Sequence, residues 1–207
     1  MPPKKLFILV STTVTVAFLA IFLSLSPSLI GADTVKSGGK DLSSELGLSK
    51  GTVVLTKEKT QDGQVFTITR QNWLIKRTLD LIGFEEEANP CADHQIDFPQ
   101  NSSSVCLVGE VGAHSMNLQI IRLAGLGLRA ASFVTKDGLV NQNIASDLPF
   151  FSFTDKNGDN LIDLIVYNRD YDSDPLQYAF KSYYLCDREG NYHFDSEERI
   201  AYNISNN

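Results

Sequence analysis

Residues 52–70 read TVVLTKEKTQDGQVFTITR, and they form the clearest structural pattern in the chain. Two runs rich in β-branched residues, Thr52–Thr60 and Gln64–Arg70, lie on either side of the Asp62-Gly63 pair. An Asp-Gly pair favours the tight turns that join neighbouring antiparallel strands, because the glycine accepts the positive φ that such turns need. This stretch therefore predicts a β-hairpin and indicates a mainly β fold.

Further strands are expected over most of the chain after Ser104. Short apolar or β-branched runs are separated there by Gly, Asp and Asn, which favour turns. The predicted strands are Val105–Val111, Met116–Leu123, Arg129–Thr135, Leu139–Ile144, Leu161–Asn168, Gln177–Cys186 and Tyr192–Phe194. Many short strands of this kind are typical of an antiparallel sandwich or of propeller-blade-like sheets.

One short helix is expected between the first hairpin and these later strands. Asn72 is a suitable N-cap residue, and Gly83 suits the end of a helix. We expect Trp73, near the start of this segment, to be a core residue. Three apolar residues recur at helical spacing: Ile75, Leu79 and Ile82.

Residues 1–32 are predicted to be a membrane-targeting segment. Lys4 and Lys5 precede an uncharged stretch, in which Leu6–Leu25 would form a helix about 30 Å long, the thickness of a bilayer core. This length favours a retained transmembrane anchor, whereas the small residues before Asp33 would suit cleavage as a signal peptide. In both cases the rest of the chain is extracytoplasmic, either membrane-anchored or periplasmic and secreted.

The rest of the chain is expected to be a linker followed by one domain. Residues 33–50 are rich in Gly, Ser, Lys and Asp, a composition typical of a flexible linker. Residues 51–207 have a suitable length for one β-rich domain with a single core.

The charge balance argues against one class of partner. The chain has 18 Lys and Arg residues against 25 Asp and Glu, which gives a formal net charge of −7. Nucleic-acid-binding proteins need positive charge to neutralise phosphates, so we expect no nucleic-acid partner. An acidic exported domain is instead expected to attract cations.

Three cysteines fit the same exported location. Cys91 and Cys106 bracket a polar loop, and a disulfide between them would close about 15 residues outside the cytoplasm. The alternative is two unpaired thiols. Cys186 is left over, and a buried free thiol is favoured there over an intermolecular bridge.

Residues 153–164, FTDKNGDNLIDL, carry the strongest chemical pattern. Oxygen-bearing side chains occupy loop positions 1, 3, 5 and 9, and position 7 can offer its backbone carbonyl. Such alternating groups converge in a tight loop, where a hard divalent cation takes about six to eight oxygen ligands. Three carboxylates without a thiolate or imidazole favour Ca²⁺ over a transition metal. The predicted ligands are Asp155, Asn157, Asp159, Leu161 and Asp163.

The loop departs from a full EF-hand loop in two positions. Position 6 is Asn160 instead of Gly, and position 12 is Val166 instead of a bidentate Glu. The residues that follow, 164–167, predict a strand and not a helix. The alternative interpretation of the whole segment is a solvated turn without metal, because Asp and Asn favour turns in any case.

This shortened loop resembles the D-x-D/N-x-D-G-x-x-D-L loop of FG-GAP/VCBS-type repeats, found in the integrin α-chain propeller and in many exported bacterial proteins. The resemblance covers about 15 residues, or about 45 with the Tyr-rich strand and the Gly190 hairpin, and it implies Ca²⁺ bound between strands. A closed propeller takes about four or more blades, so a single copy does not imply a whole propeller. The same local pattern also looks like a small family of periplasmic β-proteins that resemble invertebrate-type lysozyme inhibitors.

Two more acidic groups follow the loop. The first is Asp170, Asp172 and Asp174, which we interpret as a charged surface loop, because no glycine there permits a tight wrap around an ion. The alternative is a second cation site. The second group, Asp187, Glu189 and Asp195, surrounds Gly190 and Asn191 and is interpreted as part of a hairpin turn.

The sequence contains no common catalytic motif, and its three histidines, His94, His114 and His193, are scattered. We therefore expect a non-catalytic, exported, calcium-binding module with a protein or glycan ligand and a membrane contact through its N-terminal segment. The alternative is a periplasmic inhibitor or immunity-type protein that blocks a cell-wall hydrolase such as lysozyme. A secreted enzyme with an unrecognised site is a third hypothesis.

Overall fold

The computed structural model describes residues 39–48, 51–60, 63–72, 75–99, 103–112, 115–125, 127–148, 150–172 and 178–201. The chain divides into two compact units, residues 1–34 and 35–207, and all described residues belong to the second. The predicted signal peptide or membrane anchor lies outside the described residues, as do Trp73, His114 and Asp174. Within the described ranges, no helix is long and apolar enough to cross a membrane.

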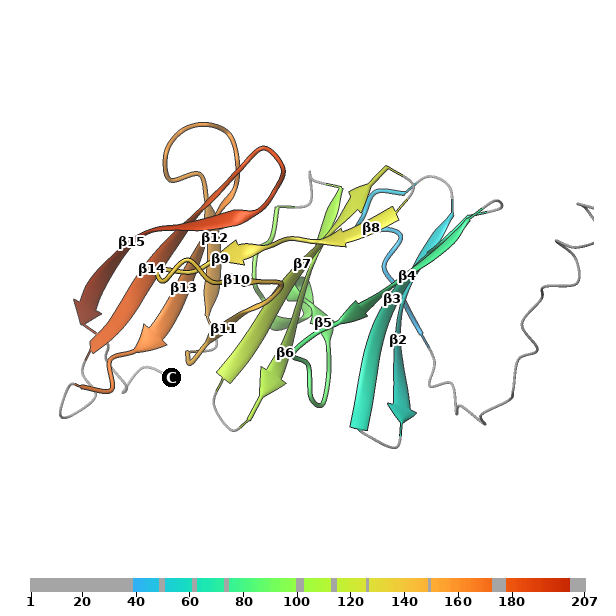
Figure 1. Cartoon of the computed structure of the whole chain (residues 1–207), viewed down its shortest axis with the longest axis horizontal. Helices are drawn as coiled ribbons and strands as arrows, with labels where there is room; N and C mark the ends of the chain where they lie inside the picture. The colour runs from blue at the N-terminus through green and yellow to red at the C-terminus, as the bar shows by residue number, and fades with distance from the viewer. Residues whose placement is uncertain are drawn as a thin grey trace, which may run out of the picture. The chain divides into compact units, whose positions relative to one another are not determined.

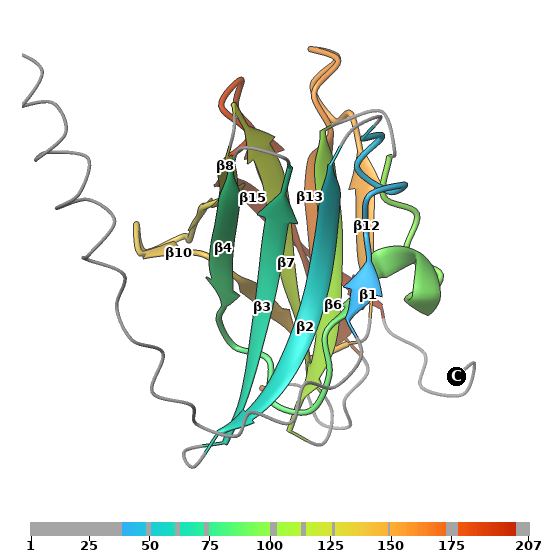
Figure 2. The same ribbon diagram turned by 90° about the vertical axis from the view of Figure 1, so that its right-hand side faces the viewer.

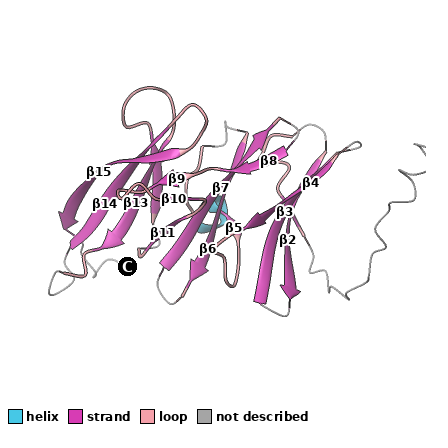
Figure 3. Ribbon diagram, viewed as in Figure 1, coloured by secondary structure: helices cyan, strands magenta, loops and turns pink. Residues whose placement is uncertain are grey.

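The second unit is mainly β, which confirms the coarser part of the predicted fold class (Figures 1 and 3). Its first sheet has the order β1-β2-β3-β4 and is antiparallel throughout. The four strands are β1 (Lys40–Asp41), β2 (Thr52–Thr60), β3 (Gly63–Gln71) and β4 (Lys76–Leu81). Strands β2 and β3 pair from Thr52 with Gln71 to Thr60 with Gly63, which is the hairpin that the sequence predicted.

The prediction of a helix after Asn72 is wrong, because Lys76–Leu81 forms β4 and pairs with β3. Asn72 starts a tight turn instead: its Oδ1 accepts the N–H of Ile75, and its own N–H donates to the Ile75 carbonyl. Leu79 packs toward the core, but Ile82 is 53% exposed, so the expected helical stripe does not share one buried face. Pairing with a neighbouring strand outweighs the local helical spacing.

Residues 39–48 are part of the fold, although the composition of residues 33–50 predicted a flexible linker. In this segment, β1 pairs with β2, while Leu42 and Leu46 are buried in the core. Lys40 also forms an ion pair with Asp93. Two leucines thus anchor a segment whose other residues are mostly small or polar, and average composition hides such anchors.

The second sheet has the order β11-β7-β6-β5, and β8 pairs with the end of β7. Its strands are β5 (Asn89–Pro90), β6 (Ser104–Val111), β7 (Ser115–Ala124), β8 (Gly127–Ala130) and β11 (Ile144–Ser146). A single 3₁₀ turn, η1 (Cys91–His94), is the only helical element in the described ranges. Cys91 in η1 forms the predicted disulfide with Cys106 in β6, and Cys186 is a half-buried free thiol.

The third sheet carries the candidate metal loop and has the order β10-β9-β15-β14-β13-β12. Its pairs are antiparallel except β15 with β9. The strands are β9 (Phe133–Val134), β10 (Val140–Asn141), β12 (Phe151–Thr154), β13 (Asp163–Arg169), β14 (Tyr178–Cys186) and β15 (Tyr192–Ala201).

Two apolar clusters hold the three sheets together, with the second sheet in the middle (Figure 2). One cluster joins the second and third sheets and includes Leu118 of β7 and Leu164 of β13. The other joins the first and second sheets and includes Ile68 of β3 and Ile121 of β7. Since β7 is covered on both faces, its burial is continuous from Met116 to Ile121 and includes the polar residues Asn117 and Gln119.

Candidate metal loop and the neighbouring turn

The candidate loop joins β12 to β13, two neighbouring antiparallel strands that pair as far as Thr154 with Asp163. The chain must reverse within the residues between them, and two of these have a positive φ. Gly158 has a φ of 77° and Asn160 a φ of 65°. Glycine and asparagine tolerate this left-handed backbone better than other residues, which explains their places in the loop.

The carboxylate of Asp155 organises the loop from its start. Its Oδ1 accepts the N–H groups of Gly158 at 2.7 Å and Asp159 at 3.2 Å, and its Oδ2 accepts the N–H of Asn160 at 3.0 Å. One side chain therefore satisfies three successive backbone donors. The acidic residue at position 1 fixes the path of the loop.

Two more predicted ligands contact each other on the exposed side of the loop. The Asn157 amide donates to Asp159 Oδ2 at 3.0 Å, and its Oδ1 accepts the Asp159 N–H at 3.0 Å. Asp159 Oδ1 accepts the N–H of Leu161 at 2.8 Å. The structure thus brings the residues at positions 1, 3, 5 and 7 together through direct hydrogen bonds.

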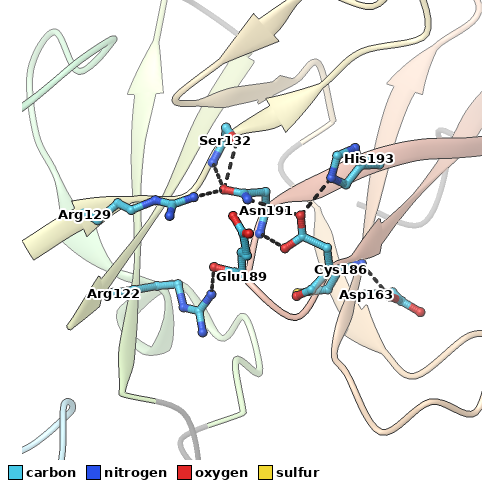
Figure 4. A network of polar contacts seen from close by, with 9 residues as sticks. Arg122, Arg129, Ser132, Asp163, Cys186, Glu189, Asn191 and His193 are labelled. Carbon is cyan, nitrogen blue, oxygen red and sulfur yellow. Dashed lines mark hydrogen bonds and ion pairs between the residues drawn. The ribbon is translucent and has the colours of Figure 1, made fainter. Parts of the chain in front are cut away.

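The fourth acidic or amide ligand, Asp163, has a different position. Its side chain is fully buried at the start of β13. Its Oδ2 accepts the Lys156 N–H at 2.9 Å, and its Oδ1 accepts the Cys186 N–H at 2.8 Å (Figure 4). Asp163 therefore links the loop to the end of β14, a structural role that the spacing pattern did not indicate.

The side chains as arranged do not form a preformed cage. In the part of the chain that the structure describes, no three His, Cys, Asp or Glu side chains gather closely enough to hold a metal ion. Asp155, Asn157 and Asp159 are exposed, so their side chains can rotate without disturbing the core. Ion binding at this loop would require that rotation.

The one positive charge of the loop does not pair with its carboxylates. Its single lysine, Lys156, places its ammonium 2.7 Å from Asp195 and 3.9 Å from the centre of the Tyr183 ring. This contact lowers the pKa of the Asp195 carboxyl. Among the described residues, no Lys, Arg or His side chain forms an ion pair with Asp155, Asp159 or Asp163.

A second Asp- and Asn-containing turn, residues 187–191, joins β14 to β15 beside the loop (Figure 4). Asp187 accepts the Asn191 N–H at 2.9 Å, and its carboxylate lies 3.0 Å from Nε2 of His193. Burial alone would raise the pKa of Asp187, but the hydrogen bonds from Asn191 and His193 outweigh it and lower this pKa to about 2. The carboxylate is held in its charged form.

This second turn is connected to the middle sheet by arginines. Asn191 Oδ1 accepts hydrogen bonds from Arg129 at 2.6 Å and from the Ser132 hydroxyl at 2.9 Å. Arg122 of β7 donates to the Glu189 carbonyl, and a Cβ at Gly190 would collide with its guanidinium. The interpretation of this acidic group as a hairpin turn is consistent with these contacts, and the arginines that complete it come from a distant strand pair.

The acidic group after β13 was expected to be a surface loop, and for Asp170 this is wrong. Asp170 is only 3% exposed, and its carboxylate accepts the Arg199 Nε–H at 2.6 Å. Its Oδ1 also accepts the N–H of Asp172, which is exposed. The partner arginine lies 29 residues away on β15, so no local pattern could have shown the pair.

Known proteins give no family assignment for this chain. No family model matches it, and neither a curated protein nor a solved structure matches it. The loop, its charge and its packing therefore have to support a functional proposal by themselves.

Proposed function

We propose that this chain is an extracytoplasmic, non-catalytic binding module whose Asp155–Asp163 loop binds one Ca²⁺ ion. The carrying observation is the charge imbalance of the loop. Three carboxylates lie within nine residues, while Lys156 faces Asp195 and Tyr183 instead of the loop. Like charges in one turn repel, and a divalent cation from solution relieves that repulsion.

The ligands would come from both side chains and backbone. Asp155 and Asp159 would supply carboxylate oxygens, Asn157 its amide oxygen and Leu161 its backbone carbonyl. Each oxygen of Asp163 accepts one backbone N–H, and a carboxylate oxygen has a second lone pair, so Asp163 could still contribute. The residues therefore match the all-oxygen donor set that Ca²⁺ prefers.

The ion would mainly stabilise the start of β13 and, with it, the folded domain that presents a surface to a partner. A ligand that binds only the folded state adds stability of RT ln(1 + [L]/Kd), about 2.7 kcal/mol at 100 times Kd. We propose that the three sheets serve as a sandwich-like scaffold for this loop, with export directed by residues 1–32.

The partner in this proposal is a protein or a glycan, and the outer face of the first sheet offers a polar surface for it. A depression of about 510 Å³ lies over β2, β3 and β4. The Oγ1 atoms of Thr56 and Thr67 are 2.7 Å apart there, and those of Thr69 and Thr78 are 3.0 Å apart. Rows of hydroxyl groups can donate to and accept from a ligand rich in hydroxyl or amide groups.

Thermal unfolding in Ca²⁺ and in EDTA tests the calcium proposal. We expect the midpoint to rise by several degrees in Ca²⁺, and we expect Asp159→Asn to remove that rise. Asp137→Asn is the matched control, because Asp137 is an exposed acid in another glycine-containing turn. A midpoint that is the same in Ca²⁺ and in EDTA rejects the ion.

The inhibitor hypothesis has its own test. The purified protein is added to assays of several lysozyme types, at concentrations up to a large excess over the enzyme. Slowed lysis would favour the alternative of a periplasmic inhibitor or immunity-type protein. Unaltered rates for every type would leave the binding module as the better proposal.

A further inference from the structure

A pocket of about 220 Å³ lies between the second and third sheets, beside the candidate metal loop. Four parts of the chain line it: the segment after η1, strands β6 and β7, the end of the metal loop, and the β14–β15 hairpin. Its volume exceeds the roughly 150 Å³ of a cavity known to hold benzene. A small organic molecule therefore fits in it.

The walls of the pocket are mostly apolar and well anchored. Ile120 and Tyr192 are buried residues of the cluster that joins the two sheets. Phe98 packs edge-on against Phe153, with ring centres 4.9 Å apart. Leu161 closes the side toward the metal loop. These walls favour a ligand with an apolar body.

The charged groups of the pocket favour an anion. Arg122 and Arg188 line it, and the acidic residue of the lining, Asp187, is already paired with Asn191 and His193. The lining thus contains two arginines against one acid, and the carboxylate of that acid is already hydrogen-bonded. A purely apolar ligand would offer no negative charge to these two arginines.

Arg122 is also held in place before any ligand arrives. It donates a hydrogen bond to the Glu189 carbonyl, and its guanidinium sits where a side chain on residue 190 would be. Gly190 has a φ of 75°, a backbone conformation that further favours glycine there. A guanidinium has five N–H donors, so a planar fork remains for a carboxylate.

We propose that this pocket binds an organic carboxylate with an apolar body of about the size of benzoate, its carboxylate on Arg122 with Arg188 at the rim. The apolar body would lie against Ile120 and Leu161. This proposal does not depend on the ion at the neighbouring loop. The carboxylate could belong to a free small acid or to the C-terminus of a peptide, and the chemistry recognised is the same.

Titrations of the isotope-labelled protein, followed by amide NMR shifts, test the pocket. The probes are benzoate against benzamide, and a tripeptide ending in Phe with a free against an amidated C-terminus. We expect the charged member of at least one pair to bind at least 10-fold more tightly, because a charge-assisted bidentate contact is lost in the neutral one. The shifts should centre on residues 160–162 and 186–192. The pair with the larger difference identifies the source of the carboxylate.

Two variants locate the contact. Arg122→Gln should weaken binding of the preferred carboxylate at least 10-fold and remove its advantage over the amide, and Arg188→Gln should have a smaller effect. Arg77→Gln, at an exposed arginine of β4, is the control and should change nothing. If Arg122→Gln does not fold, the comparison of acid and amide binding to the unaltered protein tests the proposal.

Three results would overturn the proposal: no binding of either acid, equal binding of acid and amide, or unchanged affinity in Arg122→Gln. Each titration is run in EDTA and in Ca²⁺. Carboxylate binding in EDTA supports the pocket even when the calcium proposal fails. A calcium effect on the thermal midpoint without carboxylate binding supports the calcium proposal and rejects the carboxylate pocket.

Discussion

Two acidic turns of the third sheet, residues 155–163 and 187–191, have the same local design. Each joins neighbouring antiparallel strands, and each begins with an Asp whose carboxylate accepts backbone N–H groups later in the turn. Each also contains a glycine with a positive φ, Gly158 or Gly190. Turn geometry alone therefore does not distinguish them.

Their charge surroundings are different. Asp187 has His193 beside it, Asn191 accepts from Arg129, and Arg122 covers Gly190. The other turn has more carboxylates, but its only lysine, Lys156, contacts Asp195. Two arginines from the middle sheet donate to the second turn, whereas among the described residues no arginine or lysine forms an ion pair with a carboxylate of the first turn. This difference is why we propose a cation from solution for residues 155–163 alone.

The largest effect is expected from Asp163→Ala. This change leaves the N–H groups of Lys156 and Cys186 without their acceptor, and we expect it to lower the free energy of unfolding by about 3 kcal/mol. Urea unfolding in EDTA and in Ca²⁺ measures it. Asp163→Asn, which keeps one acceptor oxygen, should lose less. A fully stable Asp163→Ala protein in EDTA would show that Asp163 is no structural link.

A smaller loss is expected at the second turn. Asn191→Ala removes the acceptor for Arg129 and Ser132, and we expect it to destabilise the fold by about 2 kcal/mol. The loss should be equal in Ca²⁺ and in EDTA, because the proposed ion binds the other turn. A loss of stability that differs between Ca²⁺ and EDTA would contradict the proposal that only residues 155–163 bind the ion.

The pH dependence of Asp187 gives an effect of about 1 kcal/mol. The pKa of this carboxyl falls from 3.8 to about 2 on folding, so its stabilisation is present above pH 4 and is lost as the pH falls toward 2. The side chain of Asp187 is 35% exposed, and solvent screening reduces the contribution to about 1 kcal/mol. The difference in unfolding free energy between the original protein and Asp187→Asn, measured from pH 7 to pH 2, should shrink over this range. A constant difference would contradict the lowered pKa.

The smallest effect is expected from Lys156→Gln. Its exposed ion pair and ring contact should contribute about 0.5 kcal/mol to stability. Calcium affinity should change by less than about 3-fold, since the ammonium faces Asp195 and not the loop carboxylates. A much tighter calcium site in Lys156→Gln would identify Lys156 as the loop's own counter-ion.

Local sequence patterns predicted most strands, because turn residues and β-branched runs act over a few neighbouring positions. The β2–β3 hairpin and the Cys91–Cys106 bridge are examples. Contacts between distant segments decided the features that the sequence did not show. The side chain of Leu42 is buried in the core, although its segment was predicted to be a linker. Residues Lys76–Leu81, where a helix was expected, form a strand because they pair with β3.

In the candidate loop too, some features follow from the local sequence and others depend on long-range contacts. Its position between two strands and its need for Gly158 and Asn160 follow from local chemistry. The burial of Asp163 depends on Cys186, which follows 23 residues later, and could not be predicted from loop spacing. The orientation of Lys156 depends on Asp195, which lies on β15. Long-range packing thus sets the charge balance on which the calcium proposal is based.

Calcium titration of the metal-free protein by isothermal calorimetry tests the central claim most directly. We expect one Ca²⁺ per chain, binding that Asp159→Asn abolishes, and unaltered binding in Asp187→Asn. No heat of binding in the original protein, or the same binding in Asp159→Asn, would contradict the assignment of the ion to residues 155–163.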